Sequence, residues 1–223
     1  MGTLATRIGG AFGILAVLVL IPAFLVGSPD QPHTADQARQ YYESGSAFVT
    51  TNGEVPLLHI LFGIVFVGAL TSMLIRAVGP RAEIYIAVSG GVIWLALTAA
   101  GLAAEVAYPA AIVRFGNATV AEFSQPMLML STWLYHYSQL GAAAMILSAS
   151  ISIWRTGVLP KWACGLGILG IPPLLHTWIG FPAAISTLAW VGLVGLVMLV
   201  AAKTTTPSAI ESRTGGSASE SES

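Results

Sequence analysis

The sequence predicts an all-α integral membrane protein, a polytopic bundle of six transmembrane helices with a short interfacial helix in the first outer loop. Two observations lead to this prediction. Hydrophobic residues make up 55% of the 223 residues, charged residues only 9%, and the mean hydropathy is +0.79, whereas soluble domains carry about 25% charged residues. Residues 127–154 are 28 positions without Asp, Glu, Lys or Arg, more than the roughly 20 apolar residues that cross a bilayer.

The composition also excludes some classes of function. The net charge of −1 leaves no large basic surface, so no nucleic-acid partner is expected. The single cysteine, Cys164, cannot form an intramolecular disulfide, and no CxxC or Cys/His spacing indicates a structural zinc site.

The first apolar run predicts a span at residues 8–26, directly after Arg7. A cleaved signal peptide is the alternative, because a short basic start and an apolar core are both present. The run is long for a signal peptide, and Leu25-Val26-Gly27 is a poor small-x-small cleavage site, so a retained helix is favoured. Three glycines on its early turns would allow a close helix contact: Gly9, Gly10 and Gly13.

Residues 28–55 form the longest polar stretch between predicted spans. Within it, Thr34-Ala-Asp-Gln37 has the form of a capping box, which predicts a helix over residues 35–44. Tyr41 and Tyr42 share one face of this helix, so we expect it to lie on the membrane surface with its tyrosines at headgroup level. A solvated loop is the alternative.

Five further apolar runs complete the six-helix domain, which covers residues 1–202. The predicted spans are residues 56–75, 84–104, 127–154, 162–179 and 183–202. Residues 106–125 are expected to form a second polar loop. Residues 203–223, rich in Thr, Ser, Gly and Glu, cannot bury apolar surface and are expected to form a disordered cytoplasmic tail.

Two features distinguish the later spans. The fourth carries Tyr135-His136-Tyr137 near its middle, and an ionisable ring inside a membrane span is a candidate functional group. At 100° per residue its histidine face and its small-residue face lie roughly 150° apart, so neighbours should enclose it on both sides. The histidine face holds Thr132, His136, Ala143 and Ser150, and the small face holds Gly141, Ala144, Ser148 and Ser152. In the fifth span, Pro172-Pro173 should kink or break the helix, and the freed carbonyls need partners or a water-lined cavity.

Six spans put both termini on one side of the membrane. If that side is the cytoplasm, only Arg39 and Arg114 are outside and the other cations are inside: Arg7, Arg76, Arg81, Arg155, Lys161, Lys203 and Arg213. This split follows the positive-inside rule and predicts cytoplasmic N- and C-termini.

Counting helix rise from the predicted span ends brings four polar residues into the outer half of the bundle: His59, Glu105, His136 and His176. They come from four different helices, as bundle sites do. His136, ten residues past Pro126, is expected roughly 15 Å deep and close to the midplane. These four residues form the candidate ligand or cofactor site.

Several functions stay open for this site. One alternative is a purely structural role, in which each histidine makes an interhelical hydrogen bond worth about 0.6 kcal/mol and takes part in no binding or catalysis. His59 and His176 could ligate a haem b for electron transfer, or could hold a divalent metal together with Glu105, with His136 as a further ligand. Metal-dependent hydrolysis would need a general base, for which Glu105 could serve if it is not a ligand.

A small-solute transporter is a further alternative, based on the broken fifth helix and on the proton-titrating His136. No catalytic residue is assigned by the sequence. The interpretation we favour is a non-enzymatic membrane protein that binds a small-molecule ligand or a membrane protein partner through an outward-facing polar cavity, surrounded by the lipid bilayer.

The pattern resembles a group of bacterial six-span membrane proteins of unknown function, common in actinobacteria. The likeness lies in the first span, in the paired tyrosines Tyr41-Tyr42, and in the turn Arg155-Thr-Gly-Val-Leu-Pro-Lys-Trp162 that leads into a glycine-rich fifth span. It covers about residues 8–202. The resemblance implies the six-span topology and the bacterial cytoplasmic membrane, and it brings no reaction and no catalytic residue.

Overall fold

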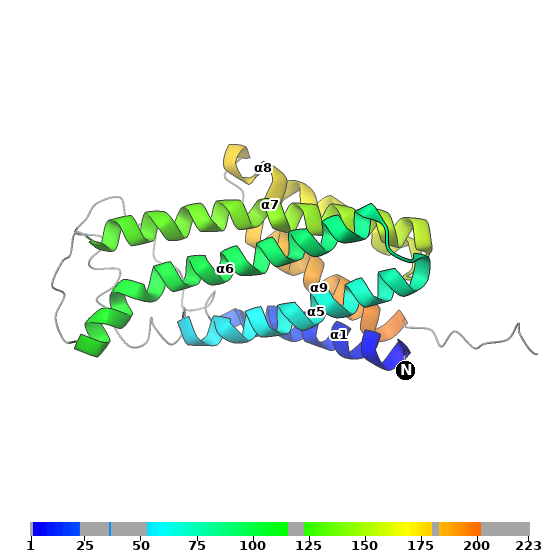
Figure 1. Cartoon of the computed structure of the whole chain (residues 1–223), viewed down its shortest axis with the longest axis horizontal. Helices are drawn as coiled ribbons and strands as arrows, with labels where there is room; N and C mark the ends of the chain where they lie inside the picture. The colour runs from blue at the N-terminus through cyan, green and yellow to red at the C-terminus, as the bar shows by residue number, and fades with distance from the viewer. Residues whose placement is uncertain (1, 23–35, 37–52, 116–122, 180–182, 202–223) are drawn as a thin grey trace, which may run out of the picture.

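The all-helical prediction is confirmed for the residues that the computed structural model describes, which are 2–22, 36, 53–115, 123–179 and 183–201. These residues form six α-helices and one 3₁₀ helix, with no strand among them. In chain order they are α1 (Gly2–Leu18), α5 (Val55–Val78), α6 (Ala82–Phe115), α7 (Ser124–Thr156), the 3₁₀ helix η3 (Lys161–Gly170), α8 (Ile171–Ile179) and α9 (Ala183–Ala201). Figure 1 shows them as an elongated bundle in which the long helices lie side by side.

Three helices are long and apolar enough to cross a membrane. They are Val55–Val78, Ala82–Ala111 and Ala183–Val200. This result is consistent with a membrane protein. The interfacial helix predicted at residues 35–44 and the tail at residues 203–223 lie outside the described residues.

Two helices differ from their predicted bounds. Helix α1 begins at Gly2 and ends at Leu18, whereas the prediction ran from residue 8 to residue 26, of which residues 23–26 lie outside the described residues. Helix α6 continues to Phe115, so residues 106–115 are helical instead of forming the start of a loop. The alanines of this stretch favour a helix, and Pro109, which lies inside it, removes one backbone hydrogen bond donor.

The two ends of the bundle differ in charge. The turn between α5 and α6 and the turn between α7 and η3 lie at the same end as the start of α1 and the end of α9 (Figure 1). Both turns contain a glycine at positive φ, Gly79 at 75° and Gly157 at 61°, a conformation that other residues rarely adopt. We call this the basic end because, among the described residues, it carries five cations and the carboxylate of Glu83; the cations are Arg7, Arg76, Arg81, Arg155 and Lys161. The opposite end is called the far end.

Glycines allow α1 to pack closely on both of its neighbours. A Cβ atom added to Gly10 would lie 2.4 Å from the carbonyl oxygen of Gly195 on α9, and one added to Gly9 would lie 2.1 Å from the Cβ of Ala69 on α5. Small residues serve this purpose in membrane bundles because they let two backbones approach. The close contact predicted for the glycines of α1 is therefore confirmed.

Helices α6 and α7 cross in the same way. A Cβ on Gly90 would lie 2.6 Å from the carbonyl oxygen of Gly141, and a Cβ on Gly141 would lie 2.7 Å from that of Gly90. On the histidine face of α7, the Cβ of Ser150 lies 2.9 Å from the position that a Cβ on Gly167 of η3 would take. Helix α7 is therefore enclosed on both faces, as its pattern predicts.

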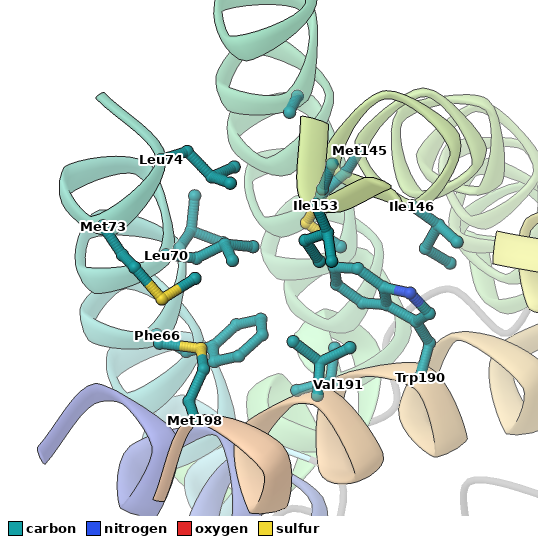
Figure 2. Close-up of a cluster of buried hydrophobic side chains, with 14 of the residues drawn as sticks. Phe66, Leu70, Met73, Leu74, Met145, Ile146, Ile153, Trp190, Val191 and Met198 are labelled. Carbon is teal, nitrogen blue, oxygen red and sulfur yellow. The ribbon is translucent and has the colours of Figure 1, made fainter. Parts of the chain in front are cut away.

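A hydrophobic core fills the space between α5, α7 and α9. Figure 2 shows side chains from these helices pointing toward one another, among them Phe66, Leu70, Met145 and Ile146. Trp190 of α9 is fully buried, and its ring meets that of Phe66 edge to face with centroids 6.1 Å apart. Such aromatic pairs contribute about 0.5–1.5 kcal/mol beyond the buried area.

At the predicted kink or break at Pro172-Pro173 the helix changes from 3₁₀ to α without an interruption, and the carbonyls that the prolines free have partners. The 3₁₀ helix ends at Gly170 and α8 begins at Ile171. Pro172 cannot donate to the Ile168 carbonyl four residues earlier, which instead accepts the N–H of Ile171. Pro173 likewise leaves the Leu169 carbonyl without a helical donor, and the hydroxyl of Ser186 on α9 donates to it. Both freed carbonyls therefore accept hydrogen bonds from groups of the protein.

Candidate functional site

Two of the predicted site histidines lie against each other. His136 of α7 and His176, in the last turn of α8, have ring centroids 4.8 Å apart and ring planes inclined by 42°. The ring of Tyr135 meets His176 edge to face, with centroids 5.2 Å apart and an angle of 89°. We call Tyr135, His136 and His176 the histidine-pair site.

Helix periodicity explains why α7 presents this pair. His136 and Ser150 share one face of α7, and Ser150 packs against Gly167 of η3. Since η3 continues directly into α8, the same face of α7 meets His176 farther along. The face predicted from the sequence therefore positions His136 correctly.

Tyr135 holds the site together through its hydroxyl. The backbone N–H of Ala184 donates to the Tyr135 hydroxyl over 3.0 Å. Ala184 is the second residue of α9, and the first N–H groups of a helix have no partner within it. Tyr135 therefore caps α9 while its ring contacts α8, so one side chain fixes three helices.

One nitrogen of the His136 ring lacks a hydrogen-bond partner among the described residues. The Nδ1 atom of His136 is buried and has no hydrogen bond to any described residue, although the ring as a whole is only partly buried. A buried polar atom without a partner costs about 1–3 kcal/mol. In a neutral imidazole one ring nitrogen donates a hydrogen bond and the other accepts one or binds a cation, depending on the tautomer. The site therefore offers a hydrogen-bonding nitrogen to a ligand.

His59 belongs to a different part of the bundle. Its ring is 2% exposed, its Nδ1 lies 2.8 Å from the carbonyl oxygen of Ala16 on α1, and the ring meets Trp94 of α6 edge to face with centroids 5.6 Å apart. A carbonyl only accepts, so Nδ1 must carry the proton and donate. Ala16 lies in the last turn of α1, where carbonyls have no helical donor. His59 thus caps α1 and joins it to α5.

The fourth candidate, Glu105, is partly buried on α6. Within the described part of the chain, no three or more His, Cys, Asp or Glu side chains lie close enough together to hold a metal ion. The set of His59, Glu105 and His176 that the metal hypothesis requires is therefore not assembled there. The structure joins His136 with His176 and directs His59 to other partners.

The depth predicted for His136 depended on where α7 enters the membrane. Helix α7 has 33 residues and is about 50 Å long, so it exceeds the roughly 30 Å core of a bilayer. Counting from Pro126 therefore gives no depth. His136 is 20 residues before Thr156, the last residue of α7, which corresponds to about 30 Å along the helix axis.

Sequence reasoning missed the role of Tyr135. The signal was present in Tyr135-His136-Tyr137, three aromatic or ionisable rings within an apolar run. Periodicity placed His136 on a face, but it could not show that the tyrosine beside it reaches the start of another helix. The contact of His59 with Trp94 was missed for the same reason, since no pattern in one helix reports its neighbour.

Comparisons with protein-family models, with curated proteins and with solved structures find no match to this chain. The resemblance to bacterial six-span membrane proteins therefore stays a prediction from the sequence.

Proposed function

We propose that the chain is a six-span protein of a bacterial cytoplasmic membrane that binds a small ligand at the histidine-pair site, and that it acts by binding and not by catalysis. One observation carries this proposal. The buried Nδ1 of His136 has no hydrogen-bond partner among the described residues, and it belongs to a ring 4.8 Å from that of His176. In the tautomer that carries its proton on Nε2, Nδ1 is an acceptor, and a ligand that donates a hydrogen bond, or a cation, would remove the cost of leaving it without a partner.

Exposed tryptophans support a position for the membrane. Trp133 and Trp154 of α7 are 52% and 63% exposed and lie 21 residues apart, about 32 Å along the helix. Tryptophans gather at both interfaces of a bilayer, whose core is about 30 Å thick. With these two residues at the interfaces, His136 lies about 5 Å inside the far-end interface, close to headgroups and away from the midplane.

The remaining three crossings follow from helix lengths. Helix α1 spans about 26 Å with its 17 residues, and η3 with α8 spans about 34 Å at 2.0 and 1.5 Å per residue. Both lengths are close to the bilayer core. Helix α7 is less apolar than the other long helices, but several of its polar side chains are buried, including Ser138 and Gln139. A helix shielded in this way can cross lipid with polar groups inside the bundle.

The basic end supports cytoplasmic termini. It carries five of the described cations, and Lys and Arg concentrate in cytoplasmic loops. The histidine-pair site lies toward the opposite end, so its ligand would enter from outside the cell. A water-soluble ligand could reach it without crossing the bilayer core.

The same geometry gives less support to the alternatives. A haem b between His59 and His176 would need the His59 ring, which is packed against Trp94 and bonded to Ala16. Transport through a broken helix would draw on freed carbonyls that line a cavity, but the carbonyls of Ile168 and Leu169 both have protein donors.

Native mass spectrometry of the full chain, purified in mild detergent, tests the proposal. We expect a bound small molecule on the wild-type protein. His136→Phe keeps an aromatic ring but removes the acceptor, so occupancy should fall at least tenfold. His136→Asn, whose amide oxygen can take the place of Nδ1, should retain part of it. Thr132→Val is the matched control, because the Thr132 hydroxyl donates only to Leu128 of its own helix.

Two results would contradict ligand binding at this site. One is a wild-type protein that carries no adduct when taken directly from its native membrane. The other is an adduct that persists in His136→Phe. A Soret band or a stoichiometric metal in the same preparation would instead favour the haem or metal alternative.

A further inference from the structure

A groove lies between α6 and α7 on the outside of the bundle. Its volume is about 650 Å³, within the roughly 300–1,000 Å³ of small-molecule sites. Gly90 and Gly141, where the two helices cross, line it. Ile86, Ile93 and Leu140 also line it and are each about half exposed. The close glycine contact thus leaves a hollow between larger side chains.

The dimensions of this groove fit an acyl chain. On α6 its lining runs from Tyr85 to Leu97, about 18 Å along the helix, and one leaflet of a bilayer core is about 15 Å thick. Both residues belong to a helix apolar enough to cross a membrane. Apart from Ser89 and two tyrosines, the lining side chains have no polar group. In a bilayer this surface faces lipid.

Cations lie where the groove meets the basic end. Arg155 follows Tyr137, a lining residue, by 18 positions, which returns it to the same face of α7. Its guanidinium donates to Glu83 over 3.0 Å, but its side chain is 56% exposed, and an arginine has five N–H donors. Arg81, which is exposed, directly precedes α6.

We propose that this groove binds one anionic glycerophospholipid from the leaflet at the basic end. One acyl chain lies between Ile86 and Ile93 of α6 and Leu140 of α7, and the phosphate pairs with Arg81 and Arg155. The charge of this end selects the lipid class. Among the described residues five cations face one carboxylate here, so an anionic headgroup is favoured over a zwitterionic one.

The test compares phosphatidylglycerol with phosphatidylcholine of the same chain length. Each lipid is titrated onto the purified full chain in detergent, and bound lipid is counted by native mass spectrometry. The wild-type protein should bind phosphatidylglycerol at least fivefold more tightly. Arg81→Gln and Arg155→Gln should each weaken phosphatidylglycerol about fivefold and weaken phosphatidylcholine less, because the choline cation offsets the charge of its phosphate. Ser89→Leu, which fills the groove, should weaken both lipids.

Lys161→Gln is the matched control for charge. Lys161 is exposed at the same end but begins η3, which packs on the other face of α7, so this variant should keep the wild-type preference. Equal binding of the two lipids by the wild-type protein overturns the proposal, as does an equal loss in Lys161→Gln.

A lipid-insensitive dimer that Ser89→Leu abolishes would assign the groove to a second copy of the chain and would also overturn the proposal. If Arg155→Gln fails to fold because Glu83 loses its partner, Arg81→Gln decides the outcome.

Discussion

Two polar side chains in this protein cap helix termini, one at the C-terminus of α1 and the other at the N-terminus of α9. His59 donates to the Ala16 carbonyl in the last turn of α1, and the Tyr135 hydroxyl accepts the Ala184 N–H in the first turn of α9. Each satisfies a backbone group that the helix itself leaves without a partner. A polar residue inside an apolar span therefore need not mark chemistry, because helix ends within a bundle need such partners too.

The first prediction concerns His59. Replacing it with Leu keeps a similar volume but leaves the Ala16 carbonyl without its donor, so the free energy of unfolding should fall by about 1–3 kcal/mol. Thermal or denaturant unfolding in detergent micelles measures this change. His59→Asn should recover much of the loss, because the Asn amide can donate from near the position of Nδ1. If His59→Leu unfolds like the wild-type protein, His59 is not the link between α1 and α5.

At the scale of elements, the fifth predicted span shows how carbonyls that lose their helical donors to two prolines find other hydrogen-bond donors. Ile171 donates to Ile168 within the chain, and Ser186 reaches across from α9 to Leu169. The second bond is tertiary, so it ties η3 to α9 beside the prolines. The Leu169 carbonyl, which has no donor within its own helix, thus links the two helices.

The second prediction follows from that bond. Ser186→Ala should lower the free energy of unfolding by about 1–3 kcal/mol, because the Leu169 carbonyl, which is partly buried, is left without a donor. Thr187→Val is the control, since the Thr187 hydroxyl donates only to Ala183 of its own helix. A double-mutant cycle with Pro173→Ala gives a sharper test. A new N–H at position 173 can donate to Leu169, so Ser186→Ala should then cost less; purely additive effects would contradict the assignment.

Single-helix patterns explain which parts of the fold could be predicted. The all-helical class, the irregularity at Pro172-Pro173 and the contact faces of α7 follow from hydropathy and 3.6-residue periodicity, because these depend on one segment at a time. The length of α6 did not follow, since residues 106–125, with Arg114 and Glu122, predicted a polar loop, whereas the alanines of residues 106–115 favour helix.

The site was predicted only in part, for a related reason. Depth counting brought His59, His136 and His176 to one region of the bundle, and two of the three do meet. Counting along separate helices gives height but not direction around the bundle axis, and direction decides which rings touch. His59 faces α1 and Trp94, which only the packing of three helices determines.

At the scale of the whole molecule, α6 and α7 are longer than a bilayer core is thick. With 34 and 33 residues they are each about 50 Å long, some 20 Å more than a bilayer core. Figure 1 shows both helices continuing at the far end beyond the starts of α5 and α9. If the basic end lies at one interface, as the positive-inside rule predicts, the excess length of both helices extends beyond the other interface.

The last prediction concerns this topology. In a Cys164→Ala background, which removes the only cysteine, single cysteines are placed at Pro80, Phe123, Val158 and Trp178. Each lies at or near an end of a proposed crossing, so labelling of intact cells by a membrane-impermeant maleimide should alternate. Positions 123 and 178 should react at once, and positions 80 and 158 only after permeabilisation.

The reverse labelling pattern would show the opposite orientation, with the histidine-pair site on the cytoplasmic side. The basic end would then lie outside the cell, against the positive-inside rule. Equal reactivity at positions 80 and 123 would show that α6 does not cross the membrane, and equal reactivity at positions 158 and 178 would remove the fifth crossing formed by η3 and α8.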